Sequence, residues 1–208
     1  MKSLALPIAL AVSLAACSSL APEKPQRATL YDLGLVTAAA PPAVPRQGAL
    51  VLADLEAAAS LEGSSLLYRL NYADGHQLQP YAHARWAAPP ARIVRQRLRE
   101  ILGRDRAILD ATESAALARS GGAMPPTLRI DLEEFSHVFD SPTQSWGVMR
   151  LRVTLMENTP AGERLVGQRM FVQRQPAPSA DAPGGVRALT AATDSAAQEI
   201  AAWLAQLR

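Results

Sequence analysis

The chain has 208 residues, of which 49% are hydrophobic and 5% aromatic, and a formal net charge of +2. A length of this order suits one domain that buries its own core. The near-neutral balance argues against a general nucleic-acid binder. The single cysteine, Cys17, excludes an internal disulfide, so the fold depends on packing alone.

The N-terminus has the features of an export signal. Lys2 is followed by the uncharged run "LALPIALAVSLAA" (4–16), which is shorter than the ~20 residues of a membrane span and fits the apolar region of a signal peptide. The sequence Leu14-Ala15-Ala16-Cys17 matches the bacterial lipobox, in which the cysteine is acylated and cleavage falls before it. We predict a signal peptide over 1–16, cleaved between Ala16 and Cys17, and acyl chains, palmitate included, on Cys17. A plain secretory signal with an incidental cysteine is the alternative.

The residues after Cys17 predict the location of the mature protein. Two or more acyl chains make a stable membrane anchor. Ser18 and Ser19 lack the aspartate that usually retains a lipoprotein in the inner membrane. We therefore expect the outer membrane, periplasmic face, with residues 17–29 as lipidated cysteine and tether and residues 30–208 as the domain.

Strands and one helix are predicted in the first half of the domain. Residues 49–57 and 65–72 have the composition of strands, and Asp74-Gly75 predicts a hairpin turn. Pro89-Pro90 suits the first turn of a helix that Gly103 can end. Its apolar stripe contains Ile93, Val94, Leu98, Ile101 and Leu102. Two proline- and alanine-rich segments, 37–49 and 174–185, are predicted to be irregular.

A strand meander and a helix are predicted in the second half. Residues 127–139 change parity at Glu133-Glu134, which indicates a β-bulge. In residues 145–157 apolar and polar residues alternate, which predicts a strand, and residues 164–173 are predicted to form its partner strand. An amphipathic helix follows over 186–207. The whole pattern predicts the α+β class: a single domain with an antiparallel sheet and amphipathic helices packed on one face.

The sequence contains no recognisable catalytic motif. Nucleophile-elbow and phosphate-loop motifs are lacking, and the three histidines, His76, His83 and His137, have no metal-ligand spacing. His137 alternates with aromatic residues, which favours a packing role. Adjacent Glu133 and Glu134 point to opposite faces and cannot share a substrate. Asp110, with Glu113 three residues on, indicates a helix start or a solvated loop. We expect no cofactor, no metal and no enzymatic activity.

Two features are candidates for contact with a partner or with lipid. The first feature is the positive charge of the predicted helix and the turn after it, which contain six arginines and only two acidic residues. These are Arg92, Arg95, Arg97, Arg99, Arg104 and Arg106, with Glu100 and Asp105. Such a face can meet lipid phosphates or an acidic partner, and a solvated face is the alternative. The second feature is the pair Tyr81 and Trp86, just before the predicted helix. Tyr and Trp side chains carry much of the binding energy at protein interfaces, and burial of these two against the sheet is the alternative. The candidate residues are Tyr81, Arg85, Trp86, Arg92, Arg95 and Arg99.

The chain resembles a known family in four places. These are the lipobox, "LYDLG" (30–34), "YAHARWAAPPARIVRQRL" (81–98) and "LRIDLEEFSHVFDSPTQSWGVMRLRVTL" (128–155). Together they resemble the ABC-type transport auxiliary lipoprotein family, over about residues 30–207. The most specific parts are Tyr31-Asp32-Leu33 and the pattern Tyr81…Arg85-Trp86…Pro89.

The resemblance implies a non-enzymatic outer-membrane lipoprotein subunit of an envelope lipid transport system. Better-known members accompany paraquat-inducible-type and other MCE (mammalian cell entry) systems of Gram-negative bacteria. The implied partners are an MCE-domain protein with its ABC permease and ATPase, and copies of the chain itself in rings or other oligomers. Direct phospholipid contact is a further expectation, and nucleic acid is not expected. A structural lipoprotein that chaperones or plugs an outer-membrane β-barrel is the alternative. A periplasmic hydrolase is a third hypothesis, for which we can name no nucleophile and base.

Overall fold

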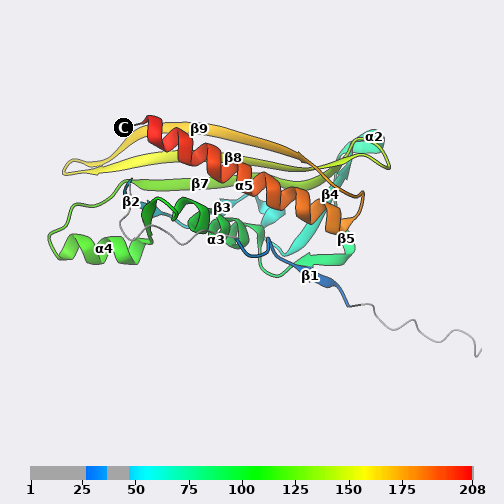
Figure 1. Cartoon of the computed structure of the whole chain (residues 1–208), viewed down its shortest axis with the longest axis horizontal. Coiled ribbons are helices and arrows are strands. Elements are labelled where there is room, and N and C mark those ends of the chain that lie inside the picture. The colour runs from blue at the N-terminus through cyan, green and yellow to red at the C-terminus, as the bar shows by residue number, and fades with distance from the viewer. Residues whose placement is uncertain (1–26, 37–46, 208) are drawn as a thin grey trace, which may run out of the picture.

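Nine strands form one open sheet in the computed structural model, which describes residues 27–36 and 47–207 (Figure 1). The strands are β1 (Thr29–Tyr31), β2 (Gln47–Leu52), β3 (Glu56–Ala57), β4 (Ser65–Leu70), β5 (Gly75–Trp86), β6 (Arg106–Leu109), β7 (Thr127–Phe139), β8 (Ser145–Thr159) and β9 (Gly162–Pro176). The helices are η1 (Ala59–Leu61), α2 (Asn71–Asp74), α3 (Pro90–Leu102), α4 (Ala111–Arg119) and α5 (Ala182–Gln206).

Strand β7 is the centre of the sheet. It pairs antiparallel with β8 along its length, and β8 pairs antiparallel with β9. On its other side β7 meets β2, β3 and β4 in succession, all parallel. β4 and β5 are antiparallel, whereas β1–β5 and β2–β6 are parallel. The α+β class is confirmed, and the antiparallel part is confined to β4–β5 and β7–β9. Parallel pairs need long connections. The connections from β2, β3 and β4 to β7 contain α3 and α4, that from β2 to β6 contains α3, and that from β1 to β5 contains β2, β3 and β4.

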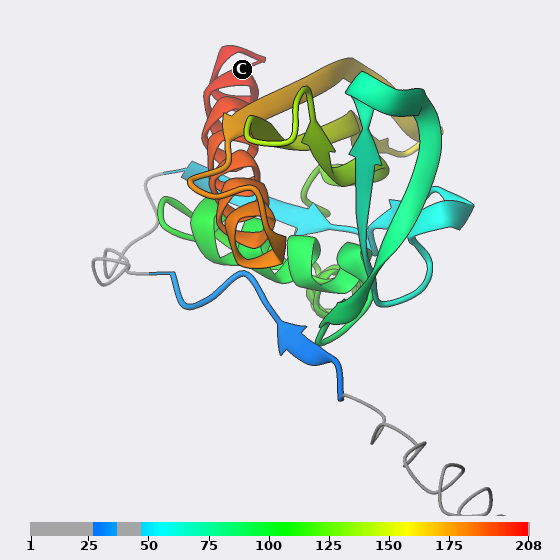
Figure 2. The same ribbon diagram turned by 90° about the vertical axis from the view of Figure 1, so that its right-hand side faces the viewer.

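Helix α5 crosses one face of β7, β8 and β9, and α3 lies beside it (Figures 1 and 2). The approach is close because Gly147 of β8 has no side chain: a Cβ there would lie 2.5 Å from the backbone carbonyl carbon of Ala188. The apolar face of α5 is fully buried at Leu189, Ala192, Ala196 and Ile200. The predicted helices on one face of a sheet are therefore confirmed.

Several local predictions are confirmed. The register of β7 shifts between Leu132 and Glu134, where the bulge was expected. Helix α3 ends at Gly103, whose N–H bonds the carbonyl of Arg99 at 2.9 Å. Asp110 caps α4 in a capping box: its Oδ1 accepts from the N–H of Glu113 at 2.8 Å, and the Glu113 carboxylate accepts from the N–H of Asp110 at 2.7 Å.

Other local predictions need correction. The segment 174–185 is not irregular throughout, because β9 continues to Pro176 and α5 begins at Ala182. Asp181 stabilises that early start, since its Oδ1 accepts from the N–H of Gly184 at 2.7 Å. Residues 47–49 belong to β2, and the rest of 37–49 lies outside the described residues. The expected hairpin at Asp74-Gly75 turns through the single helical turn α2.

None of the described helices combines the length and the hydrophobicity that a membrane span needs. The predicted signal peptide, Cys17 and most of the tether lie outside the described residues.

Candidate functional site: the N-terminal strap and its flanking hollows

The first described segment, residues 27–36, forms a strap along the domain, and we refer to it by that name. Its strand β1 pairs in parallel with the end of β5, with Leu30 opposite Arg85 and Tyr31 opposite Trp86. The carbonyl of Tyr31 accepts from the N–H of Ala87 at 2.7 Å. Figure 2 shows the strap passing across one end of the domain, beneath α5. The polypeptide that follows Cys17 therefore joins the domain at this end.

The strap turns into the core directly after β1. The Asp32 Oδ1 accepts from the N–H of Gly34 at 2.8 Å, and Gly34 has a φ of 67°, a conformation that favours glycine. Leu33, held between them, is 6% exposed and belongs to the hydrophobic core. The sequence "YDLG" is thus explained by a turn that buries one leucine.

Arg97 of α3 holds the strap against the domain. Its Nε and Nη2 donate to the two carboxylate oxygens of Asp194 on α5, at 2.6 and 2.7 Å, and its Nη1 donates to the carbonyl of Gly34 at 3.1 Å. This bidentate pair is of the strong, geometrically specific kind. The hydrogen bond to Asp194 raises the pKa of Arg97 above its ordinary value. Arg97 is 8% exposed, so this member of the basic run joins three parts of the fold and is not free for a partner.

Two open hollows flank the strap, and both are lined by Asp32, Leu33, Gly34 and Ala87. The larger, of about 710 Å³, continues along α3. The smaller, of about 610 Å³, continues toward the first turns of α5. Leu35 of the larger hollow is 96% exposed and Leu30 of the smaller is 67% exposed. Each hollow therefore offers an uncovered leucine beside the segment that leads back to Cys17.

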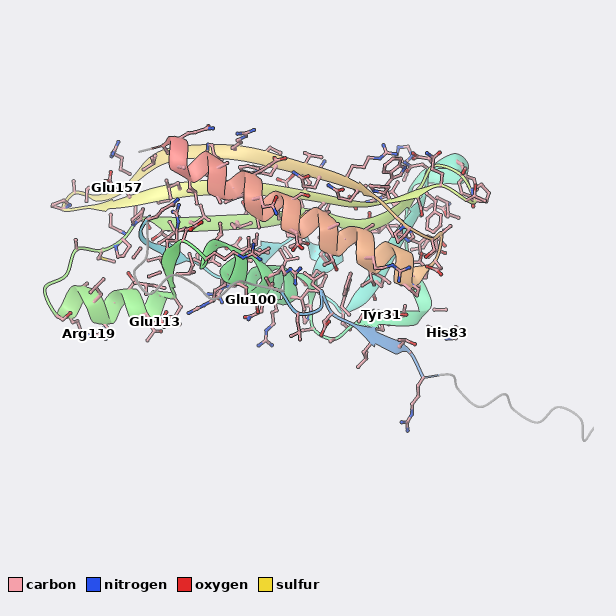
Figure 3. The ribbon with its side chains drawn as sticks, in the orientation of Figure 1. Tyr31, His83, Glu100, Glu113, Arg119 and Glu157 are labelled. Carbon is pink, nitrogen blue, oxygen red and sulfur yellow. The ribbon has the colours of Figure 1, made fainter. Side chains whose placement is uncertain are left out.

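Two of the candidate arginines line the larger hollow together. Arg92 is exposed and makes no ion pair with any described residue. Arg95 donates to the carbonyls of Ala53 at 3.1 Å and Leu52 at 3.0 Å, and its Nε lies 3.5 Å from the Asp54 carboxylate. Figure 3 labels Glu100 on α3 and Tyr31 on the strap, which lie in the lower half of the domain.

The charges of the larger hollow are mixed. Asp32, Asp54 and Glu100 line it together with Arg92 and Arg95, and Arg97 is neutralised by Asp194. Leucine, isoleucine and alanine residues also line this hollow. Such a surface fits the polar rim and apolar centre of a protein interface, or a zwitterionic head group, better than a purely anionic ligand.

Trp86 is not a surface contact, and this prediction is corrected. Its side chain is 1% exposed, and its ring centroid lies 5.3 Å from that of Phe135. The alternation of β5 turns Ala84 and Trp86 inward together, and the strap covers the edge of the strand. The Trp86 Nε1 has no hydrogen-bond partner within the described chain. The burial alternative therefore holds for this residue.

Tyr81, Arg85 and Arg99 do not join Arg92 and Arg95. The Tyr81 hydroxyl lies 2.8 Å from Nδ1 of His137, and burial raises the Tyr81 pKa well above its ordinary value. Arg85 donates to the carbonyls of Ala84, at 2.9 Å, and Tyr81. The Arg99 Nη2 lies 3.5 Å from the carboxylate of Glu113 on α4. The structure thus brings together two of the six candidates.

The expected packing role of His137 is confirmed. Its side chain is fully buried, 4.3 Å from the ring of Phe139 by centroids. Burial lowers its pKa from 6.5 to about 4, although Asp181 opposes the shift. Helix α5 approaches so closely that a Cβ on Gly185 would lie 2.5 Å from Nδ1. His137 is therefore neutral at pH 7 and inaccessible to a substrate.

Sequence reasoning did not find the strap, although one signal was present. Asp32 and Gly34 on either side of a leucine indicate a turn from the sequence alone. The partner of Arg97 is 97 residues away, so no local pattern could predict that ion pair. Within the described residues, no group of three or more His, Cys, Asp or Glu side chains could hold a metal ion.

The chain is similar to one protein family and to several solved structures. A family model described as "ABC-type transport auxiliary lipoprotein component" matches residues 31–201. No curated protein matches the chain. Among solved structures, protein XCC0632 from Xanthomonas campestris, described as DUF330, is 20% identical, with a TM-score of 0.68 over 86% of this chain and 96% of that one. A second, described as uncharacterised, is 16% identical, with a TM-score of 0.61 over 86% and 99%. At these identities the likeness shows the shared fold.

Proposed function

We propose that this chain, which belongs to the ABC-type transport auxiliary lipoprotein family, is a non-enzymatic outer-membrane subunit of an envelope lipid transport system. Cys17 carries the lipid anchor on the periplasmic face. The domain docks an MCE-domain protein, whose ABC permease and ATPase supply the energy from the inner membrane. The chain associates with copies of itself, and phospholipid contact is part of the same proposal.

The observation that carries this proposal is the junction of the strap with the core. A domain held by its N-terminus needs a firm connection between the tether and the fold. Leu33 is buried, the turn at Gly34 is fixed by Asp32, and Arg97 binds the strap to α3 and α5 at once. From Cys17 to Arg27 the chain spans at most about 35 Å, at roughly 3.5 Å per residue. The strap end of the domain accordingly stays close to the membrane.

The docking surface that we assign is the larger hollow and its rim. It combines the uncovered Leu35 with Arg92 and Arg95, and the helix that carries both arginines is itself anchored by Arg97. A rigid helix presents side chains to a partner with less loss of conformational freedom than a loop does. A partner that covers Leu35 and pairs with Arg92 would use the exposed groups of this end.

The test is photocrosslinking in cells that express the lipidated protein at its natural level. A photoreactive residue replaces Arg92, and a matched control replaces Arg119, an exposed arginine at the end of α4. We expect adducts with the MCE-domain protein from position 92 and few or none from position 119. Adducts with a β-barrel protein instead would replace the transport proposal by the assembly role. Equal labelling from both positions would remove the hollow as the docking surface.

A further inference from the structure

Strand β9 is a long edge of the sheet that the fold leaves open. Among the described residues it pairs with β8 alone, and Figure 1 shows no strand beyond it. The register shift opposite Leu155 and Met156 ends its regular part on one side, and Pro176 ends it on the other. Edge strands usually protect themselves with charges, bulges or a short length. Between its two limits β9 carries the exposed Arg169 and Arg174, and it also exposes Met170 (41%) and Val172 (59%).

The backbone groups that face the open edge can be identified. The N–H of Ala177 donates to the carbonyl of Ser145 at 2.9 Å, which continues the ladder that pairs Gln175 with Gly147 and Phe171 with Leu151. Hydrogen-bonded and non-hydrogen-bonded pairs alternate in an antiparallel ladder. The odd-numbered residues from 167 to 177 therefore bond to β8. The even-numbered ones turn their N–H and C=O groups outward: Gln168, Met170, Val172 and Arg174.

We propose that β9 pairs antiparallel with β9 of a second copy of this chain, with Met170 opposite Val172 of the partner subunit. The two-fold axis then passes at Phe171, and each Met–Val pair occurs twice. The inference rests on the self-association proposed above and names its interface. It uses one edge of each copy, so the contact closes at two copies, and any larger assembly contains them in pairs.

The order of side chains along β9 selects this register. It places Gln168 opposite Arg174 of the partner subunit, and on the α5 side it places Arg169 opposite Gln173 of the partner subunit. No like charges face each other, and apolar residues face apolar residues.

Registers shifted by two residues fit less well. One shift puts Met170 opposite the partner's Arg174 and Gln168 opposite the partner's Pro176, which has no N–H to donate. The opposite shift places Gln168 against the partner's Val172. Each shifted register keeps one apolar pair, on the two-fold axis: Val172 opposite the partner's Val172 in the first, and Met170 opposite the partner's Met170 in the second. The proposed register has two such pairs.

The positive charges beside the edge are compensated in part within each copy. On the outer face of the sheet Val172 lies beside Arg150 and Met170 beside Arg152. Both arginines are paired with Glu133, at 3.0 and 2.6 Å. Arg174 is paired with Asp140 and stacks over the ring of Trp146, 4.4 Å from its centroid. Arg169, on the α5 side, lies over the ring of Phe171, 5.1 Å from its centroid, and has no ion pair among the described residues. The positive charge beside the edge is therefore compensated in part within each copy.

The first test measures association of the full-length lipidated protein in detergent by sedimentation equilibrium. Replacing both Met170→Lys and Val172→Lys sets lysine against lysine across the edge. Leu165→Lys is the matched control, because Leu165 is also exposed on β9 (57%) but lies beyond the register shift. We expect the double variant to associate more than about tenfold more weakly than wild type, and the control to match wild type. Circular dichroism confirms that all three remain folded.

Two other outcomes separate the interface from the self-association on which it rests. An oligomeric double variant would overturn the β9 interface and leave self-association standing. A monomeric wild-type protein would overturn both.

The second test fixes the register with cysteines. Met170→Cys and Val172→Cys are prepared as separate lipidated proteins, in which acylated Cys17 has no free thiol. Directly opposed residues of a hydrogen-bonded pair lie ~5.5 Å apart between Cα atoms, within disulfide range, whereas identical residues across this axis lie beyond ~7 Å. We expect covalent dimers on oxidation of the mixture and none from either protein alone. Dimers from a single variant alone would overturn the register.

Discussion

Two edges of the sheet, at β5 and at β9, are formed in different ways. At the first, β5 is covered by the three residues of β1, and the strap then sends Leu33 into the core and receives a hydrogen bond from Arg97. At the second, β9 runs for 15 residues with α5 on one face and nothing described along its edge. The first of these edges is covered by the chain itself, and the second is open among the described residues.

The strap edge therefore affects the stability of the fold, and the β9 edge affects association with a second copy. At the strap edge Leu33 belongs to the core and Tyr31 packs against it, so changes to the contacts that hold the strap lower the stability of the fold. At β9 the side chains of Met170 and Val172 are exposed, so changes there leave stability almost unaltered and alter association. Four variants test this contrast, and their expected effects on stability decrease from Trp86 through Arg97 and His137 to Val172.

The largest effect is expected at Trp86, the buried partner of the strap. Trp86→Ala should lower the free energy of unfolding by about 4 kcal/mol, because a large core side chain is lost and a cavity is left. Trp146→Ala, on β8 beside β9, is the same substitution at a half-buried site, where the indole stacks with Arg174. It should cost less than half as much. Urea unfolding monitored by far-ultraviolet circular dichroism measures both, and equal losses would contradict the contrast.

The next effect is expected at Arg97. Arg97→Ala should cost about 3 kcal/mol, because it leaves the Asp194 carboxylate and the Gly34 carbonyl without their donor at a largely buried site. Arg99→Ala is the control on the same helix, since Arg99 makes a longer, solvent-exposed pair with Glu113. Its cost should stay below about 1 kcal/mol. Urea midpoints at constant m-value give the comparison, and similar costs would show that Arg97 does not hold the strap.

A smaller effect follows from the buried His137 between the two edges. Its pKa is about 4 in the folded protein and 6.5 ordinarily, so between these values the unfolded chain binds the extra proton. This contribution to stability is complete above pH 6.5 and is lost as the pH falls toward 4. Between pH 7 and 4.5 it amounts to about 2 kcal/mol.

The matched variant for this pH dependence is His137→Gln, which cannot titrate. Asp181, whose pKa is lowered by Ser179 and the Gly184 N–H, loses its contribution only below its ordinary 3.8 and stays outside this window. Urea unfolding at pH 7 and 4.5 should therefore show a smaller pH-dependent loss in the variant. The same loss in both proteins would assign the acid sensitivity to other groups.

The smallest effect on stability is expected at Val172. Val172→Thr keeps the β-branched shape at a site that is 59% exposed, so the free energy of unfolding should change by less than about 0.5 kcal/mol. Association should weaken, because one apolar contact at each end of the proposed edge pairing becomes polar. Thermal unfolding and sedimentation of the same preparation separate the two quantities. A clear loss of stability would mean that Val172 is already packed in the single chain.

Elements with a local cause were predictable from the sequence. The bulge at Glu133-Glu134, the end of α3 at Gly103 and the buried position of His137 all follow from alternation or from turn chemistry in a few residues. The parallel pairing of β2, β3 and β4 with β7 was not predictable, because it depends on which distant strands meet.

The site was less predictable than the fold for the same reason. Arg97 belongs to a run of arginines that all look alike in the sequence, and only Asp194 on α5 makes it structural. Trp is a residue type that is common at interfaces, and the sequence alone does not show that the strap and Phe135 cover Trp86. Arg92 and Arg95 are the two candidates that the fold places together at an open surface.

The most direct test of the transport role is affinity purification of the lipidated protein from detergent-solubilised envelopes, followed by quantitative mass spectrometry. A protein with the double change Arg92→Glu and Leu35→Ser serves as the matched control. The proposal predicts co-purification of an MCE-domain protein with its ABC permease and ATPase, and their depletion from the control at equal yield of folded protein. Recovery of a β-barrel protein in their place, or of the chain alone, would contradict it.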